Sequence, residues 1–468
     1  MSQVGSESNP LRVAIIGAGP AGFYAAERLL KEKKLTIEID IYDRLPTPFG
    51  LVRAGVAPDH PKIKSVTKIF DRTAKKPNVR FFGNVELGKH VCVDDLVKHY
   101  HQILYSIGAQ TDRRLNIPGI DLENSHAATS FVAWYNGHPD FRNHQFDLTQ
   151  ERVAVIGVGN VAMDVARIMC RTREELMKTD IADYALEALS NSNIKEVYVL
   201  GRRGPAQAAF TTPEIKELGE MEDCDIRVLP EEAALDELSQ NSLVDADRST
   251  TRKIEIIESY AGRPFTGKSR KITVRFLVSP TELIDNGNGK VAKMRLVKNE
   301  LYATDSGSLR PRATETIEDI SVGLVFRSIG YRGVPVEGVP FNESWGVILN
   351  EQGRVLEGDS GEPLVGHYTA GWIKRGPSGV IGTNKPDATE TVELMLKDLA
   401  NGVHLQPSLP DVETAVSFVR ERQPDVVRYA DWQYLDEMEL ARGAEQGRPR
   451  VKFTDVAEMV EVVRNRNR

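Results

Sequence analysis

Cysteine is scarce in this chain. Its 468 residues include only Cys92, Cys170 and Cys224, which lie far apart, and no C-x-x-C motif is present. A dithiol relay of the thioredoxin-reductase kind and a four-cysteine iron–sulfur cluster within the chain are therefore excluded, because each needs paired or clustered thiolates. A sparse and odd cysteine count is typical of a reducing compartment.

Long apolar runs are also missing. No stretch reaches the roughly 18–20 apolar residues that cross a bilayer. The polar start MSQVGSESNP shows no signal or transit peptide. The formal net charge of -7 argues against nucleic acid as a general partner. We therefore predict a cytoplasmic protein without a membrane span, and the length is sufficient for two to three domains.

Residues 11–43, LRVAIIGAGPAGFYAAERLLKEKKLTIEIDIYD, have the pattern of a complete βαβ unit. Apolar strands are expected over 13–16 and 37–42, with a helix over 23–30 between them. The first strand leads into a G-x-G-x-x-G motif, and the second strand is followed by an acid: Gly17, Gly19, Gly22 and Asp43. These glycines suit a tight turn, close approach of a pyrophosphate and close helix packing, and the acid can accept hydrogen bonds from ribose. The stretch predicts a dinucleotide site.

A second glycine motif, G-x-G-x-x-A, is formed by Gly157, Gly159 and Ala162. The strand predicted over 194–200 ends in Gly201-Arg202-Arg203, without an acid. A carboxylate there would repel a ribose 2′-phosphate, whereas paired guanidiniums can grip one. We therefore predict that this site binds NADP(H) rather than NAD(H). The alternative is that the two arginines are an ordinary exposed pair without a ligand. Two unlike dinucleotide sites favour electron transfer between a bound flavin and a diffusing nicotinamide.

Further elements follow from periodicity and turn signals. A helix is expected over 62–73, after a loop rich in Pro and Gly. Hairpin strands are expected over 271–278 and 290–298, on either side of Asn286-Gly287-Asn288-Gly289. The mildly basic tail after Ala441 is interpreted as a solvated extension.

Four motifs carry a resemblance: PFGLVRAGVAPDHP, GVGNVAMDVAR, GRRGPAQAAFT and GWIKRGPSGVIGTN, which begin at residues 48, 157, 201 and 371. With them the sequence resembles the adrenodoxin reductase family of NADPH–ferredoxin reductases, among the glutathione-reductase-like flavoproteins. The resemblance implies an α/β fold of two Rossmann-like domains, with an NADP domain (111–333) inserted into a discontinuous FAD domain (1–110 and 334–468). It also implies an FAD-dependent ferredoxin–NADP(+) reductase that takes a hydride from NADPH and passes single electrons to a small iron–sulfur protein.

The resemblance also implies the residues of each site. FAD would be bound by Gly17, Gly19, Ala21, Gly22, Asp43, Leu51, Val85, Trp372, Gly379, Val380 and Ile381. NADP(H) would be bound by Gly157, Gly159, Asn160, Val161, Arg202, Arg203, Glu214 and Gly379. Residues 379–381 would open a helix whose N–H groups stabilise the negative charge of reduced flavin.

The roles of five further residues are less specific. His60 and Glu217 would lie close to the stacked rings, where they would assist proton balance or, for His60, only fix the loop around it. Lys216, Arg248 and Arg252 would form a basic face for an acidic ferredoxin, and the alternative is an ordinary solvated face. No metal site is expected.

Three alternatives remain open. A chain like the small subunit of glutamate synthase would carry an N-terminal cysteine-rich region, which this sequence lacks. A flavin-dependent monooxygenase would need a peroxyflavin pocket, for which no motif is visible. A flavin-binding sensor would be yellow but would not bleach with NADPH.

Overall fold

The computed structural model describes residues 3–243 and 247–466 and divides into two compact units. One unit comprises Met1–Val56, His60–Thr111 and Tyr331–Arg468. The other comprises Ala57–Asp59 and Asp112–Gly330, so it is inserted into the first along the chain. We call them the outer unit and the inserted unit.

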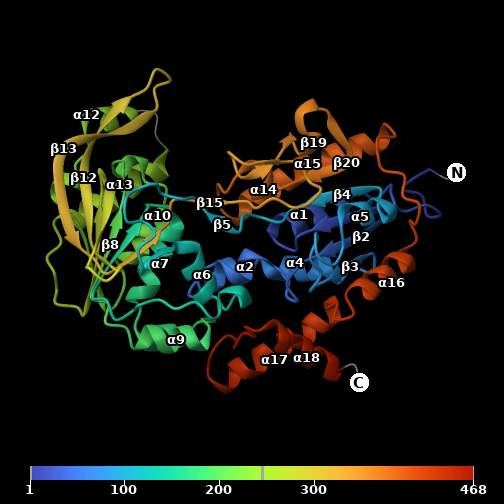
Figure 1. The fold of residues 1–468 in the computed structure, drawn as a ribbon, viewed down its shortest axis with the longest axis horizontal. Helices are drawn as coiled ribbons and strands as arrows, with labels where there is room; N and C mark the ends of the chain where they lie inside the picture. The colour runs from blue at the N-terminus through green and yellow to red at the C-terminus, as the bar shows by residue number, and fades with distance from the viewer. Residues whose placement is uncertain (1–2, 244–246, 467–468) are drawn as a thin grey trace. The chain divides into compact units, whose positions relative to one another are not determined.

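The outer unit is built on a seven-stranded sheet of order β18-β19-β20-β4-β1-β2-β3. The five strands from β20 to β3 run parallel, and β19 and then β18 extend the sheet antiparallel beyond β20. Figure 1 shows the orange strand β20 beside the blue N-terminal strands, although they are far apart in sequence. The strands are β1 (Leu11–Ile16), β2 (Ile37–Tyr42), β3 (Val79–Phe82), β4 (Gln102–Tyr105), β18 (Asn350–Glu351), β19 (Arg354–Leu356) and β20 (Pro363–Thr369).

Helices cover both faces of this sheet, and its central strands are accordingly buried. On one face α1, α4 and α15 pack in a core with Phe23, Phe70 and Met395, and on the other α5 contributes Leu96. The helices of the unit are α1 (Pro20–Leu29), α2 (Leu51–Ala54), α3 (Pro61–Lys64), α4 (Thr67–Ala74), α5 (Val93–His99), α14 (Trp372–Arg375), α15 (Asn384–Ala400), α16 (Val412–Arg422), α17 (Tyr429–Glu445) and α18 (Val456–Arg466). Its short elements are β15 (Tyr331–Arg332), β16 (Phe341–Asn342), β17 (Val347–Ile348), η3 (Gly358–Ser360) and η4 (Ile381–Thr383), and β5 (Thr111–Asp112) lies where the chain passes between units.

Two predictions for this unit need correction. The helix expected over 62–73 is broken into α3 and α4, because the Ser65 and Thr67 hydroxyls donate to the backbone oxygens of Lys62 and Lys64 and compete with the helical pattern. The tail after Ala441 is not a solvated extension, since Phe453 and Met459 are each only 1% exposed within the core.

The inserted unit has a six-stranded parallel sheet of order β6-β14-β7-β8-β10-β9. Its strands are β6 (Ser125–Ala127), β7 (Arg152–Ile156), β8 (Glu196–Leu200), β9 (Cys224–Val228), β10 (Arg270–Arg275) and β14 (Leu324–Arg327). Its helices are α6 (Ala128–Tyr135), α7 (Asn160–Cys170), α8 (Arg173–Leu176), α9 (Asp183–Ser190), α10 (Thr212–Leu218), α11 (Pro230–Ala233), α12 (Glu237–Ser242) and α13 (Arg248–Ala261), with the short turns η1 (Pro139–Phe141) and η2 (Pro205–Gln207).

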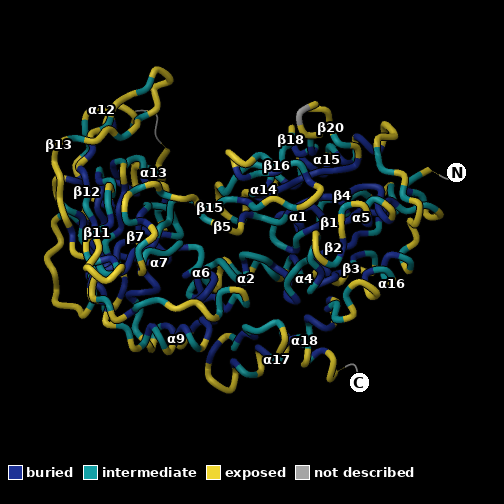
Figure 2. Tube along the Cα trace, viewed as in Figure 1, coloured by how far each residue is buried: buried dark blue, intermediate teal, exposed yellow. Residues whose placement is uncertain are grey.

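A separate antiparallel sheet completes the inserted unit, formed by β11 (Val278–Asp285), β12 (Val291–Ala303) and β13 (Leu309–Ser321). The predicted turn at 286–289 joins β11 to β12. The prediction that 271–278 forms the first hairpin strand is wrong, because β10 pairs in parallel with β8 and β9 instead. Figure 2 shows β13 largely exposed at the sheet edge.

The helices of the described ranges, 3–243 and 247–466, include none with the length and hydropathy of a membrane-spanning segment.

Candidate dinucleotide sites

The first glycine turn connects β1 to α1 in the outer unit. Gly17 has φ +107°, and a Cβ added there would lie 2.5 Å from the Ser106 carbonyl oxygen. A Cβ on Gly22 would lie 2.3 Å from the Gly17 carbonyl oxygen, whereas one on Gly19 would meet nothing within 4 Å. The first and third glycines are therefore required by the protein's own packing. The second leaves open space at the start of α1, where a pyrophosphate can approach.

Asp43 follows β2 and ties this turn to the next loop. Its carboxylate accepts hydrogen bonds from the backbone N–H of Ala18 and of Leu45, each at 2.9 Å. Burial raises the pKa of Asp43, and the two N–H donors and Arg44 only partly oppose that rise. Because a carboxylate offers about four lone-pair sites, the group can still accept from ribose hydroxyls.

The loop after Asp43 returns to the glycine turn. Phe49 has φ +84° and donates its N–H to the Ala18 carbonyl oxygen at 2.8 Å. A Cβ on Gly50 would lie 3.0 Å from the Gly19 Cα, and Leu51 begins α2 directly afterwards. Val85 is buried and donates its N–H to the Asp43 carbonyl oxygen at 2.9 Å. Local pairing thus gathers the predicted N-terminal FAD residues at the carboxyl ends of β1 and β2, where ligands bind in open α/β sheets.

The predicted C-terminal FAD residues follow β20, at the same edge of the sheet. Gly371 has φ +81°, and a Cβ there would lie 2.7 Å from the Cβ of Ala21 on α1. The Trp372 indole N–H donates to the Ser378 carbonyl oxygen at 3.2 Å, which fixes the ring over the following turn. Gly379 has φ +79°, Val380 is 52% exposed, and Ile381 begins the 3-10 turn η4 that leads into α15. A short turn therefore precedes the helix that these residues were expected to open directly.

The second glycine turn, between β7 and α7 of the inserted unit, repeats this construction. Gly157 has φ +128°, and a Cβ there would lie 2.1 Å from the Ser328 carbonyl oxygen, whereas one on Gly159 would meet nothing within 4 Å. Asn160 and Val161 form the first turn of α7. The Asn160 side-chain oxygen accepts from the Thr211 N–H at 2.9 Å, so the segment that follows Arg203 folds back onto this turn.

The two arginines after β8, Arg202 and Arg203, are neighbours in sequence. Arg202 is exposed and Arg203 is half-buried. Burial and the charge of Arg202 lower the pKa of the Arg203 guanidinium. Among the described residues, no carboxylate forms an ion pair with either side chain. Two adjacent guanidiniums are suited to binding a doubly charged phosphate.

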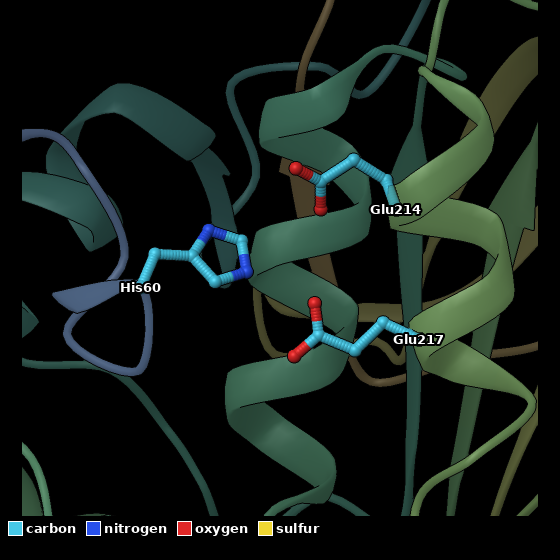
Figure 3. A group of neighbouring side chains, drawn as sticks. All are labelled: His60, Glu214 and Glu217. Atoms are coloured by element: carbon cyan, nitrogen blue, oxygen red, sulfur yellow. The ribbon is translucent and has the colours of Figure 1, made fainter. Parts of the chain in front are cut away.

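Glu214 and Glu217 lie one turn apart on α10, and Figure 3 shows their carboxylates on the same side of that helix. Arg167 of α7 lies 3.1 Å from Glu214 and 3.7 Å from Glu217, and its guanidinium is 0% exposed. Figure 3 also draws His60, which precedes α3 in the outer unit. The structure thus places both predicted glutamates in one ionic network.

Sequence reasoning missed the rest of this network. Arg167 also pairs with Asp59 at 2.8 Å and with Asp164 at 2.6 Å, and Arg171 pairs with Asp59 at 3.2 Å and with Glu217 at 3.0 Å. Burial alone would lower the pKa of the Arg167 guanidinium, but the neighbouring carboxylates raise it by more than that. The sequence did contain a signal for this network. An arginine within a helix as apolar as α7 indicates a buried cation that needs carboxylate partners.

The three predicted partner-binding cations lie on adjacent helices of the inserted unit. Arg248 and Arg252 are one turn apart on α13, as their spacing predicted, and Lys216 is on α10. The two helices are joined by the Thr212 hydroxyl, which donates to the Ser249 carbonyl oxygen at 2.9 Å. Lys216 and Arg252 each pair with an acid on their own helix, Glu220 at 3.3 Å and Glu255 at 2.7 Å.

Comparisons with known proteins bear on both units. A model of the pyridine nucleotide-disulphide oxidoreductase family matches residues 11–199. The NADPH-ferredoxin reductase FprA of Mycobacterium leprae (strain TN) is 45% identical over 455 residues, which cover 96% of this chain and 98% of that protein. The mitochondrial NADPH:adrenodoxin oxidoreductase of Arabidopsis thaliana is 37% identical over 470 residues, with 98% and 97% covered. The solved structure of Mycobacterium tuberculosis FprA in complex with NADPH matches with a TM-score of 0.91 and 44% identity, covering 97% of this chain and 100% of that one.

These matches run through both sheets and both glycine turns. They confirm the predicted fold class, with one Rossmann-like unit inserted into a discontinuous other. The chain belongs to the adrenodoxin reductase-like NADPH–ferredoxin reductase family of flavoproteins.

Proposed function

We propose that this protein is an FAD-dependent NADPH–ferredoxin reductase, which takes a hydride from NADPH and passes single electrons to a small iron–sulfur protein. One observation carries the proposal: the chain has two glycine turns of the same construction, followed in one case by Asp43 and in the other by the adjacent cations Arg202 and Arg203. The relative from Mycobacterium leprae is itself named an NADPH-ferredoxin reductase.

The outer unit would hold FAD, which supplies both two-electron and one-electron chemistry when bound. Gly19 leaves room for the pyrophosphate at the start of α1, and Asp43 accepts from the ribose. Leu51 and Val85 would line the cofactor from the returning loop. Trp372 and residues 379–381 would border the flavin, with backbone N–H groups that favour negative charge.

The inserted unit would hold NADPH. Gly157 shapes the turn, and Gly159, Asn160 and Val161 would place the pyrophosphate at the start of α7. Arg202 and Arg203 would grip the 2′-phosphate, and Glu214 would orient the nicotinamide end. Gly379 of the outer unit is assigned to both cofactors.

His60 and Glu217 are proposed to maintain proton balance near the reacting rings. Hydride transfer itself needs mainly alignment of the two rings, so neither residue has to act as a nucleophile. Arg167 and Arg171 hold Glu217 in an ionic network.

The first experiment is an anaerobic titration of the purified protein with NADPH and NADH. We expect a yellow protein whose visible absorbance bleaches with NADPH at far lower concentration than with NADH. A protein that is colourless, and that takes up no added FAD, would refute the proposal. A yellow protein that does not bleach would instead identify the flavin-binding sensor.

The partner is proposed to be an acidic ferredoxin-type protein that docks transiently, with the protein in the cytoplasm. Replacing Arg248 and Arg252 together by Glu should reduce ferredoxin-dependent cytochrome c reduction about tenfold at low salt, because rim charges act mainly on association rate. Ferricyanide reduction should be unchanged. The matched control is Arg310→Glu with Arg312→Glu on β13. An equal loss in the control, or no loss at α13, would contradict this docking surface.

A further inference from the structure

The strained turn beside the first glycine motif is held by the C-terminal part of the chain. Phe49 has a left-handed backbone, φ +84°, which non-glycine residues rarely adopt. Such a conformation persists only where the surroundings over-determine it, and it often marks a functional site. The turn is in contact with the glycine motif through the hydrogen bond from the Phe49 N–H to the Ala18 carbonyl oxygen.

Two side chains of α17, the helix labelled near the C-terminus in Figure 1, contact this turn. Trp432 lies edge-on to the Phe49 ring, with ring centres 6.0 Å apart, and the Arg53 guanidinium stacks 5.0 Å from the centre of the indole. Glu439 accepts from both terminal nitrogens of Arg53, with Nη1 at 2.8 Å. Since Trp432 and Glu439 are two turns apart on one face of α17, they hold the two ends of the Phe49–Arg53 segment.

The Glu439 carboxylate is fully occupied. It is 0% exposed, and besides Arg53 it accepts from Arg450 Nη1 at 3.0 Å and from the Phe453 N–H at 2.8 Å. Burial raises the pKa of Glu439, but the guanidiniums of Arg53 and Arg450 more than offset this and hold it below its ordinary value. A charged, saturated carboxylate of this kind fixes the position of Arg53, because displacing it would leave a buried charge unpaired.

We propose that Glu439 is a positioning residue for flavin binding, which with Trp432 holds the Phe49–Arg53 turn against the glycine motif. The role rests on the proposed function for the identity of the cofactor. Glu439 itself touches no reacting atom. It acts through Arg53, and thereby sets where Gly50 and Leu51 stand beside Gly19.

The test compares Glu439→Gln with a matched control, Asp398→Asn. Asp398 of α15 also forms a two-point ion pair, with Arg354 at 2.7 and 2.8 Å, and is 8% exposed, but it does not contact the turn. Each variant is freed of flavin and titrated with FAD by fluorescence quenching. The visible circular dichroism of the bound flavin and the thermal midpoint are then measured.

We expect both variants to lower the thermal midpoint, but only Glu439→Gln to raise the Kd for FAD, by at least tenfold, and to change the flavin dichroism. Equal FAD affinity in the wild type and Glu439→Gln, or an equal loss in both variants, would overturn the proposal. If Glu439→Gln does not fold, Arg53→Lys is measured in its place, and the same rise in the Kd for FAD is expected. Lysine keeps the charge but cannot form the two-point contact. A wild-type chain that binds no FAD would instead refute the proposed function, and this role with it.

Discussion

The two glycine turns have the same backbone construction but differ in the charge that follows them. In each, the first glycine has positive φ and packs on a carbonyl oxygen of a neighbouring strand end, while the second faces open space. After β2 the chain places one half-buried carboxylate that two N–H groups already engage. After β8 it places two adjacent guanidiniums, and none of the described carboxylates forms an ion pair with them. We propose that the shared part binds a pyrophosphate and that the difference in charge selects the dinucleotide at each turn.

The largest effect is expected when the two cations that distinguish the second turn are removed. With Arg202→Ala and Arg203→Ala together, we expect the KM for NADPH to rise about a hundredfold while the KM for NADH changes less than threefold. Hydrogen bonds to charged groups contribute roughly 1.5–3 kcal/mol each, reduced here because the site is partly exposed. Steady-state kinetics with both coenzymes measure the change.

A matched control for this change is Arg295→Ala, which removes a surface arginine of β12 that already pairs with Glu282 and Asp319. Its coenzyme preference should stay that of the wild type. Persistence of NADPH preference in the double variant would show that the arginines do not read the 2′-phosphate.

Alanine at the second and third glycines tests the shared part. A methyl group at Gly22 would collide with the Gly17 carbonyl oxygen, so Gly22→Ala should destabilise the flavin-free protein by about 2–3 kcal/mol. Gly19→Ala meets no protein atom within 4 Å and should leave the thermal midpoint unchanged, yet it should weaken FAD about tenfold by filling the approach. Thermal unfolding and FAD titration of both variants check this. A lower thermal midpoint in Gly19→Ala would mean that folding itself requires a glycine at this position.

Local sequence was sufficient to predict what each turn contains. Gly17, Gly157 and Asp43 lie within a few residues of the strands and helices that position them, so spacing along the chain reports their geometry. The same holds for Arg202 and Arg203, which directly follow β8. Which of these residues bind FAD and which bind NADP(H) stays a prediction, as does the role of His60.

Features that depend on distant partners could not be predicted. The residues of β10 have the composition of a hairpin strand, and only β8 and β9, far away in sequence, make it a central parallel strand. Arg167 finds its four carboxylates from three separate segments. The C-terminal tail carries many charges, yet Met459 and Val463 form one buried stripe at helical spacing that its overall composition hides.

The smallest expected effect is on how stability depends on pH, and it should differ between the two turns. Because burial raises the pKa of Asp43 above its ordinary value of about 3.9, the folded flavin-free protein binds a proton in a pH range where the unfolded chain does not. The contribution of Asp43 to stability should therefore rise as pH falls from 7 through its raised pKa, and Asp43→Asn should lack this increment. The guanidiniums of the second turn keep their charge throughout this range, so Arg203→Ala should leave the pH profile of the thermal midpoint unchanged. If the wild type and Asp43→Asn have parallel profiles between pH 7 and 4, the carboxylate after β2 is not the desolvated group that distinguishes the first turn from the second.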